Sequence, residues 1–86
     1  MNIDEIITKA KKIACQPDIA TGTNGRGGVS TSQAMDMNVT IDGPVCIKHN
    51  KIIIPIDVFY FSTFNHHKKR VILNRNTFQV VQLIKQ

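Results

Sequence analysis

Residues 2–15 place their apolar side chains with a helical period. The apolar positions recur at intervals of three and four, which puts them on one face of an α-helix. This stripe consists of Ile3, Ile6, Ile7, Ala10, Ile13 and Ala14. Asn2 and Glu5 have the spacing of a capping box, and Pro17 ends the helix because the residue before a proline avoids the α conformation. We predict an amphipathic helix over residues 2–15.

From Met37 onward the apolar positions form the short, alternating runs that are typical of β-strands. Short connections make sequential strands the expected neighbours in a sheet. The pattern predicts an α+β fold in which the N-terminal amphipathic helix packs on an antiparallel sheet of about five strands in meander order. We expect residues 1–86 to form a single domain with its strand region at 37–85. The expected strands cover residues 38–42, 45–49, 52–63, 70–75 and 77–85.

Turn-forming residues between these runs predict where the chain reverses. Asp42-Gly43-Pro44 is expected to turn the chain between the first two strands, and Asn50-Lys51 suits a tight hairpin loop. Residues 65–69 are expected to form a polar hairpin tip. In the last strand, alternation predicts one face with Phe78, Val80 and Ile84 and an opposite face with Val81 and Leu83.

The run from Ile52 to Thr63 is apolar on both of its faces. A single helix covers only one face of a sheet, and an uncovered apolar face is unusual on a monomer. We therefore expect either a curled, barrel-like sheet or a homodimer formed through the second face, and slightly favour the homodimer. Pro55 lacks an N–H group and marks a bulge or an unpaired position within the run.

A glycine-rich segment at residues 21–28 lies within an expected loop that covers residues 18–36. Glycines allow close backbone approach, and consecutive N–H groups can cradle an anion. Arg26, in the middle of this segment, is a candidate anion-binding residue. The segment has neither the P-loop nor the dinucleotide-binding fingerprint. A flexible loop is the simpler interpretation.

The positive charge of the chain lies in its C-terminal half. The formal net charge is +5, and residues 44–86 hold seven of the eleven Lys and Arg residues but only one of the six acidic residues. This asymmetry predicts a surface for an anionic partner, either nucleic acid or an acidic protein surface. The candidate binding residues are Arg26, His66, His67, Lys68, Lys69, Arg70 and Arg75.

Three functions fit this charge distribution. The favoured hypothesis is a small, basic, non-enzymatic protein that contacts nucleic acid through a basic hairpin. An alternative is a phage or mobile-element inhibitor or adaptor that binds a host nucleic-acid-handling protein. The third is a compact RNase toxin in which His66 or His67 supplies acid–base chemistry, with Lys69, Arg70 and Arg75 holding the phosphate. Asp57 could pair with a histidine or an arginine.

The sequence predicts neither a cofactor nor a metal site. Cys46 and His49 have a C-x-x-H spacing, but adjacent histidines such as His66 and His67 point to opposite faces of a strand, so four convergent zinc ligands are not expected. The chain has two cysteines, Cys15 and Cys46, which do not form a disulfide-rich pattern or a C-x-x-C motif. This favours a reducing compartment. No run has the length of a signal sequence or membrane span. We expect a cytoplasmic protein, bacterial or, if phage-encoded, in the host cytoplasm, without a membrane partner.

Overall fold

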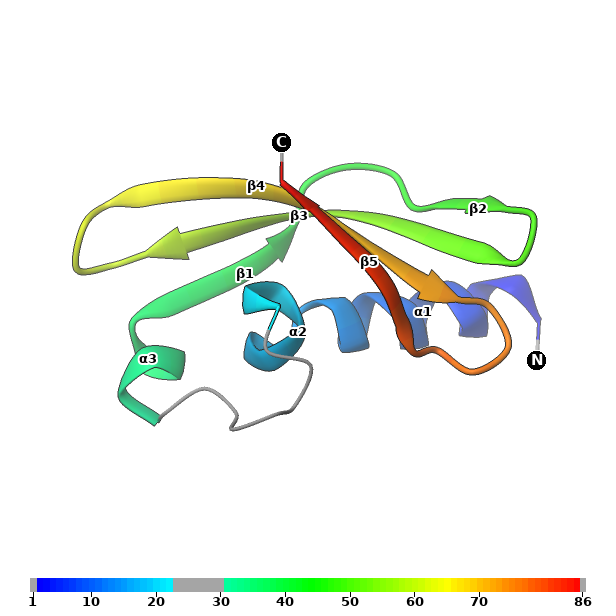
Figure 1. Cartoon of the computed structure of the whole chain (residues 1–86), viewed down its shortest axis with the longest axis horizontal. Coiled ribbons are helices and arrows are strands. Elements are labelled where there is room, and N and C mark those ends of the chain that lie inside the picture. Colours follow the sequence, from blue (N-terminus) through cyan, green and yellow to red (C-terminus); the bar gives the residue numbers. More distant parts are fainter. Residues whose placement is uncertain (1, 23–30, 86) are drawn as a thin grey trace.

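The computed structural model describes residues 2–22 and 31–85. Five antiparallel strands form one sheet, and the helices lie on one side of it (Figure 1). The helices are α1 (Ile3–Ala14), α2 (Pro17–Thr21) and α3 (Thr31–Met35). The strands are β1 (Met37–Ile41), β2 (Cys46–Lys48), β3 (Lys51–Tyr60), β4 (Asn65–Asn74) and β5 (Val80–Lys85). This confirms the predicted α+β class, with the N-terminal helix on an antiparallel sheet. The sheet does not close into a barrel.

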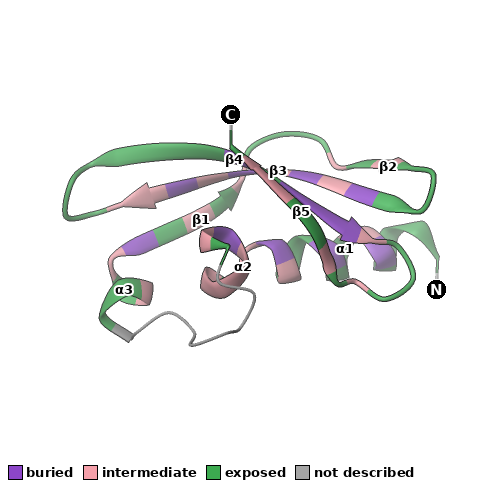
Figure 2. Ribbon diagram, in the orientation of Figure 1, coloured by how far each residue is buried: buried purple, intermediate pink, exposed green. Residues whose placement is uncertain are grey.

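The core lies between β3 and the helices. Every second residue of β3 points to this side because strand side chains alternate between the two faces. These residues, together with two from β4, are completely buried (Figure 2): Ile52, Ile54, Ile56, Val58, Val71 and Leu73. Ala10 and Ala14 of α1 are also completely buried, and such small side chains let the helix approach the sheet closely.

Helix α1 has the boundaries that its capping residues dictate. The side-chain oxygen of Asn2 accepts a hydrogen bond from the backbone N–H of Glu5 at 2.9 Å, which is one of the two bonds of the predicted capping box. The Glu5 carboxylate accepts from the side-chain amide of Asn2 at 3.4 Å. The chain leaves α1 at Cys15, and Pro17 then occupies the first turn of α2, where its missing N–H costs nothing. The expected loop over residues 18–36 was therefore too long, since α2 and α3 take up part of it. The segment 23–30 lies outside the described residues.

One edge of the sheet is a strand broken in two. β1 and β2 do not pair with each other. Both are antiparallel to β3, β1 opposite Ile56–Tyr60 and β2 opposite Lys51–Ile53. Asp42-Gly43-Pro44 therefore interrupts an edge strand and does not reverse the chain, contrary to the expectation. Gly43 suits this break because a Cβ atom there would lie 3.3 Å from the ring of Pro55.

The hairpin between β3 and β4 turns earlier than predicted. β4 begins at Asn65, so the expected polar tip at residues 65–69 is part of a strand and the turn is Phe61–Phe64. The last pair between β3 and β4 joins Tyr60 to Asn65. β3 therefore ends before the apolar run does, and Phe61 belongs to the turn. The polar sequence of β4 belongs to a strand with solvent on one side.

The facing of β5 also differs from the expected alternation. The pairing with β4 shifts between Ile72 and Leu73 and leaves Val81 without a partner in β4. Val80 therefore lies opposite Leu73, and Leu83 lies opposite Val71. Val80 and Leu83 therefore both pack against the core, whereas Ile84 lies opposite Arg70 on the other face. A β-bulge changes the parity of every residue that follows it, and simple alternation cannot anticipate it.

We expect the core side of β3 to dominate the stability of the fold. Ile54→Ala deletes a completely buried side chain and should lower the free energy of unfolding by about 2–5 kcal/mol. Val81→Ala removes an apolar side chain that is 51 % exposed and should change it by less than about 0.5 kcal/mol. Urea denaturation of both variants makes the comparison. Equal losses would contradict the assignment of the core to this side.

Candidate functional site

The face of the sheet opposite the helices carries most of the charged side chains of β3 and β4. We call it the open face, because no described helix lies on it (Figure 1). Residues that pair directly across an antiparallel sheet point to the same side. Pairing therefore places four residues of β3 and four of β4 on the open face: Ile53, Pro55, Asp57, Phe59, His66, Lys68, Arg70 and Ile72.

Two carboxylate contacts lie along the open face, an ion pair made by Lys68 and a hydrogen-bonded contact made by His66. Nζ of Lys68 donates to Oδ1 of Asp42 at 2.9 Å, and this bond raises the pKa of Lys68, with a smaller contribution from the charge of Asp57. Nδ1 of His66 lies 2.7 Å from Oδ2 of Asp57. These contacts occupy two of the predicted cationic residues with carboxylates of the same face. Neither is therefore a free phosphate ligand.

Asp57 fixes the orientation of His66. The carboxylate is largely buried, with 13 % of its side chain exposed, while the histidine side chain is 58 % exposed. The ring of Phe59 lies against the imidazole, with 4.6 Å between the ring centroids. A His–Asp couple with an accessible Nε2 can act as a general base. The Oδ1 atom of Asp57 is buried and accepts no hydrogen bond from the described residues.

Three other cations of this face form no ion pair with any described carboxylate. Arg70 lies opposite Pro55 in the middle of the face, and Lys48 and Lys51 lie opposite each other at its end. The backbone N–H of Arg75 donates to the carbonyl of Asn50 at 2.8 Å, which brings Arg75 to the same end of the sheet. The turns of two hairpins thus bring Arg75 to the end of the sheet that carries Lys48 and Lys51, although it is far from them in the sequence.

A shallow hollow lies beside Arg70 where the edge strand is interrupted. Its volume is about 390 Å³, and its lining combines Asp42 with apolar groups. The remaining lining residues are Gly43, Pro44, Cys46, Ile53, Pro55 and Arg70. A guanidinium beside an apolar surface suits a planar group that carries negative charge nearby.

The odd-numbered residues of the predicted basic cluster lie on the opposite face. His67 packs edge-on against Tyr60, with 5.3 Å between the ring centroids. Lys69 is buried, and its Nζ donates to the backbone carbonyl of Ala20 in α2 at 3.0 Å. Burial and the charge of Lys85, which lies opposite in the sheet, lower the pKa of Lys69. Lys69 therefore joins α2 to β4 and is not available to a partner.

The strand register thus divides between two faces the residues that the sequence brings together, although the segment from His66 to Lys69 lines one hollow of about 390 Å³ with Tyr60 and Lys85. His66, Lys68 and Arg70 share the open face, His67 and Lys69 lie on the helix side, and Arg75 lies at the other end of β4. Arg26 lies outside the described residues. Sequence reasoning missed the contribution of Lys48 and Lys51. The strand-end positions of these two lysines were the available signal, but their meeting with Arg75 depends on the pairing of two separate hairpins.

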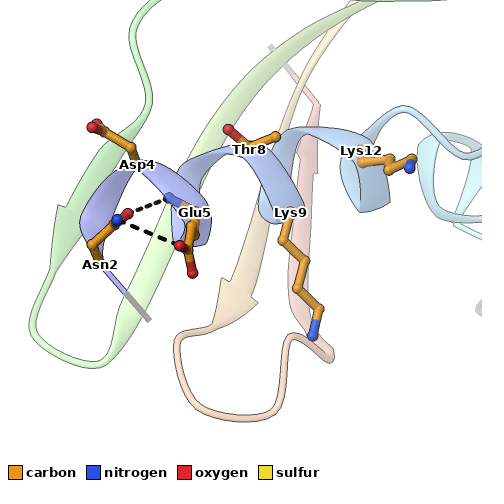
Figure 3. Close-up of a pocket in the computed structure, with 6 residues that line it drawn as sticks. All are labelled: Asn2, Asp4, Glu5, Thr8, Lys9 and Lys12. Carbon is orange, nitrogen blue, oxygen red and sulfur yellow. Dashed lines mark hydrogen bonds between the residues drawn. The ribbon is translucent and has the colours of Figure 1, made fainter.

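A second hollow, on the outer surface of α1, reflects the helix cap. Figure 3 shows that its lining comes entirely from the helix and its N-cap: Asn2, Asp4, Glu5, Thr8, Lys9 and Lys12. The hydrogen bonds drawn there are those of the cap. Nζ of Lys9 lies 4.5 Å from the centre of the Phe78 ring, which fastens the helix to the turn before β5. This surface has a structural explanation without a ligand.

Within residues 2–22 and 31–85, no group of three or more His, Cys, Asp or Glu side chains is arranged to hold a metal ion. Burial raises the pKa of the Cys15 thiol. None of the described helices has the length and hydrophobicity needed to cross a membrane. Comparison of the chain with protein-family models, with curated proteins and with solved structures finds no match.

We expect Lys69 to make stability depend on pH. Because its pKa in the folded protein lies below the ordinary 10.5, the unfolded chain binds more protons between these two values. The free energy of unfolding therefore rises with pH across this window, and Lys69→Met removes the effect. Relative to this variant, the unaltered protein should gain stability in urea denaturation as the pH rises toward 10.5.

Lys12→Met is the control, because it removes an exposed lysine from α1. The unaltered protein and Lys69→Met differ in their free energy of unfolding. If this difference stays constant with pH, Lys69 does not titrate as its burial implies.

Proposed function

We propose that the protein binds nucleic acid on the open face of its sheet. The observation that carries the proposal is a group of three cations, Lys48, Lys51 and Arg70, without carboxylate partners among the described residues. Lysine and arginine side chains neutralise phosphates and release counterions, which drives association with nucleic acids. This differs from the basic hairpin expected from the sequence, because most of that segment is occupied by internal contacts.

The character of the open face supports a polar, extended ligand. Lys48, Lys51, Lys68 and Arg70 outnumber Asp42 and Asp57, so the face keeps a positive balance after its ion pairs are formed. The half-buried apolar residues Ile53 and Pro55 lie between the charged rows. From Lys51 to Phe59 the strand spans about 26 Å, the rise of eight residues in a β-strand. Phosphates of one bound strand could therefore contact several cations at once.

Removing charge from this face should weaken binding and its dependence on salt. Lys51→Gln with Arg70→Gln deletes two cations but keeps most of each side-chain stem. With a labelled single strand of about 15 nucleotides, fluorescence anisotropy should show a lower affinity and a log–log salt slope smaller by about 1.4, since each phosphate contact contributes about 0.7.

The matched control removes the same charge from the other side of the molecule. Lys11→Gln with Lys12→Gln changes two exposed lysines of α1, and its salt slope should stay close to that of the unaltered protein. Equal slopes for both double variants would assign binding to overall charge and not to the open face. Absence of binding by the unaltered protein to RNA and DNA would overturn the proposal and favour an acidic protein surface as the partner.

A compact RNase is the second candidate, and the His66–Asp57 pair is the observation that favours it. Cleavage at a 2′-hydroxyl needs a base for that hydroxyl and an acid for the leaving oxygen. The expected companions of His66 are only partly brought to it. Arg70 shares the open face, and His67 and Lys69 line one hollow with His66, although their side chains belong to the helix side of the sheet. Arg75 lies at the far end of the strand. Because Lys69 is buried and bonded to Ala20 and Arg75 is distant, this set favours binding over cleavage.

We therefore expect labelled RNA to remain intact during incubation with the protein. His66→Ala should give the same result, as judged by denaturing gel electrophoresis. Cleavage by the unaltered protein that disappears in His66→Ala, while Lys12→Ala retains it, would instead assign RNase activity to this histidine.

A further inference from the structure

The turn between β3 and β4 exposes two aromatic rings at one end of the open face. Phe64 is 79 % exposed and Phe61 is 47 % exposed, although both are large apolar residues. Phe59, the last residue of β3 on the open face, lies 5.2 Å from Phe61 and 6.3 Å from Phe64, measured between ring centroids. The three rings form an aromatic group that continues into the His66 imidazole. Exposed apolar groups of this kind mark interaction surfaces.

The backbone of Phe64 adopts a conformation that is unusual for an aromatic residue. Its φ angle is 55°, in the left-handed region where glycine and asparagine are favoured and a bulky side chain is an outlier. The aromatic side chain therefore neither suits the local backbone nor contributes to the core. Strained positions that persist without a packing benefit are concentrated at functional sites.

Phe78 shows the contrast within the same chain. It has a similar φ angle of 58°, but its ring packs against the core and lies under the ammonium group of Lys9. Burial and the cation–π contact explain an aromatic residue at that left-handed position. The ring of Phe64 contacts Phe59 but stays 79 % exposed, so burial does not explain an aromatic residue at this position.

The turn that carries these rings is held in place. Asp36, at the junction of α3 and β1, accepts hydrogen bonds from the backbone N–H of Ser62 at 2.9 Å and from its hydroxyl at 2.7 Å. The backbone carbonyl of Asp36 also accepts from the N–H of Phe61 at 2.8 Å. An anchored turn presents the rings in a fixed position, which reduces the entropy lost on binding.

We propose that Phe64 and Phe61 form a stacking platform for unpaired bases, so that the ligand of the open face is single-stranded nucleic acid. This inference rests on the proposed function. Unpaired bases can stack on aromatic side chains, whereas the bases of a duplex are already stacked on one another. Lys48 and Lys51 lie at the opposite end of the same face, about 26 Å from Phe59 along β3, and Arg70 lies between the two ends. An extended single strand that follows β3 would place its bases on the rings and its phosphates on these cations. A protein partner would use the rings only as apolar area, which the variants below separate from stacking.

The test compares two substitutions at one position. Phe64→Leu keeps an apolar side chain but removes the ring, and Phe64→Tyr keeps the ring. Anisotropy with labelled oligo-uridine and oligo-thymidine of about 15 nucleotides should show a loss of about 5- to 150-fold in affinity for Phe64→Leu and an affinity near the original for Phe64→Tyr. A duplex of the same length should bind both variants equally. Urea denaturation confirms that both remain folded.

The outcomes separate the two proposals. If the unaltered protein binds the single strand and Phe64→Leu binds as tightly as Phe64→Tyr, the platform is wrong and the electrostatic function stands. A loss in Phe64→Leu of the same size for duplex and single strand would also overturn the platform. If the unaltered protein binds neither ligand, the proposed function itself fails.

Discussion

The complete burial of one row of β3 is the constraint on which the rest of the structure depends. Ile52, Ile54, Ile56 and Val58 are inaccessible to solvent, and the strand pairs with β1, β2 and β4. A shift by a single residue would exchange this row for Ile53, Pro55 and Asp57, burying a carboxylate and a proline against the helices. The register of β3 therefore sets the register of its partners, and with it the composition of the open face.

This alternation also divides the basic segment of β4. Residues that are crowded in the sequence are assigned in turn to the helix side and to the solvent side. Lys69 is drawn into a hydrogen bond with Ala20, whereas Arg70 next to it is exposed. The charge that remains free comes partly from another hairpin, at Lys48 and Lys51. A linear cluster of cations is therefore a poor guide to a binding surface when the cluster lies on a strand.

The parts of the fold that follow local rules could be predicted, and those that depend on pairing could not. The helical period, the Asn2 cap and the stop at Pro17 act within one turn of a helix, so residues 2–17 were enough to place α1. The break at Gly43-Pro44 resembles a reversing turn until the partner of each flanking strand is known. The Val81 bulge and the start of β4 at Asn65 are set by cross-strand partners. Likewise Asp57 was expected to need a cationic partner, but choosing His66 required the register.

The interrupted edge has a consequence for association between copies of the chain. An unbroken edge strand offers a row of free N–H and C=O groups on which another chain can continue the sheet, and this is a route to aggregation. Here the outer row next to β3 is divided into pieces of five and three residues. Pro44 within the break has no N–H to offer, and the N–H of Asp42 is directed inward to the carbonyl of Pro55. The irregularity at Val81 breaks the continuity of β5, the strand on the opposite border. A sheet bounded in this way can display exposed phenylalanines without providing a continuous template for fibre growth.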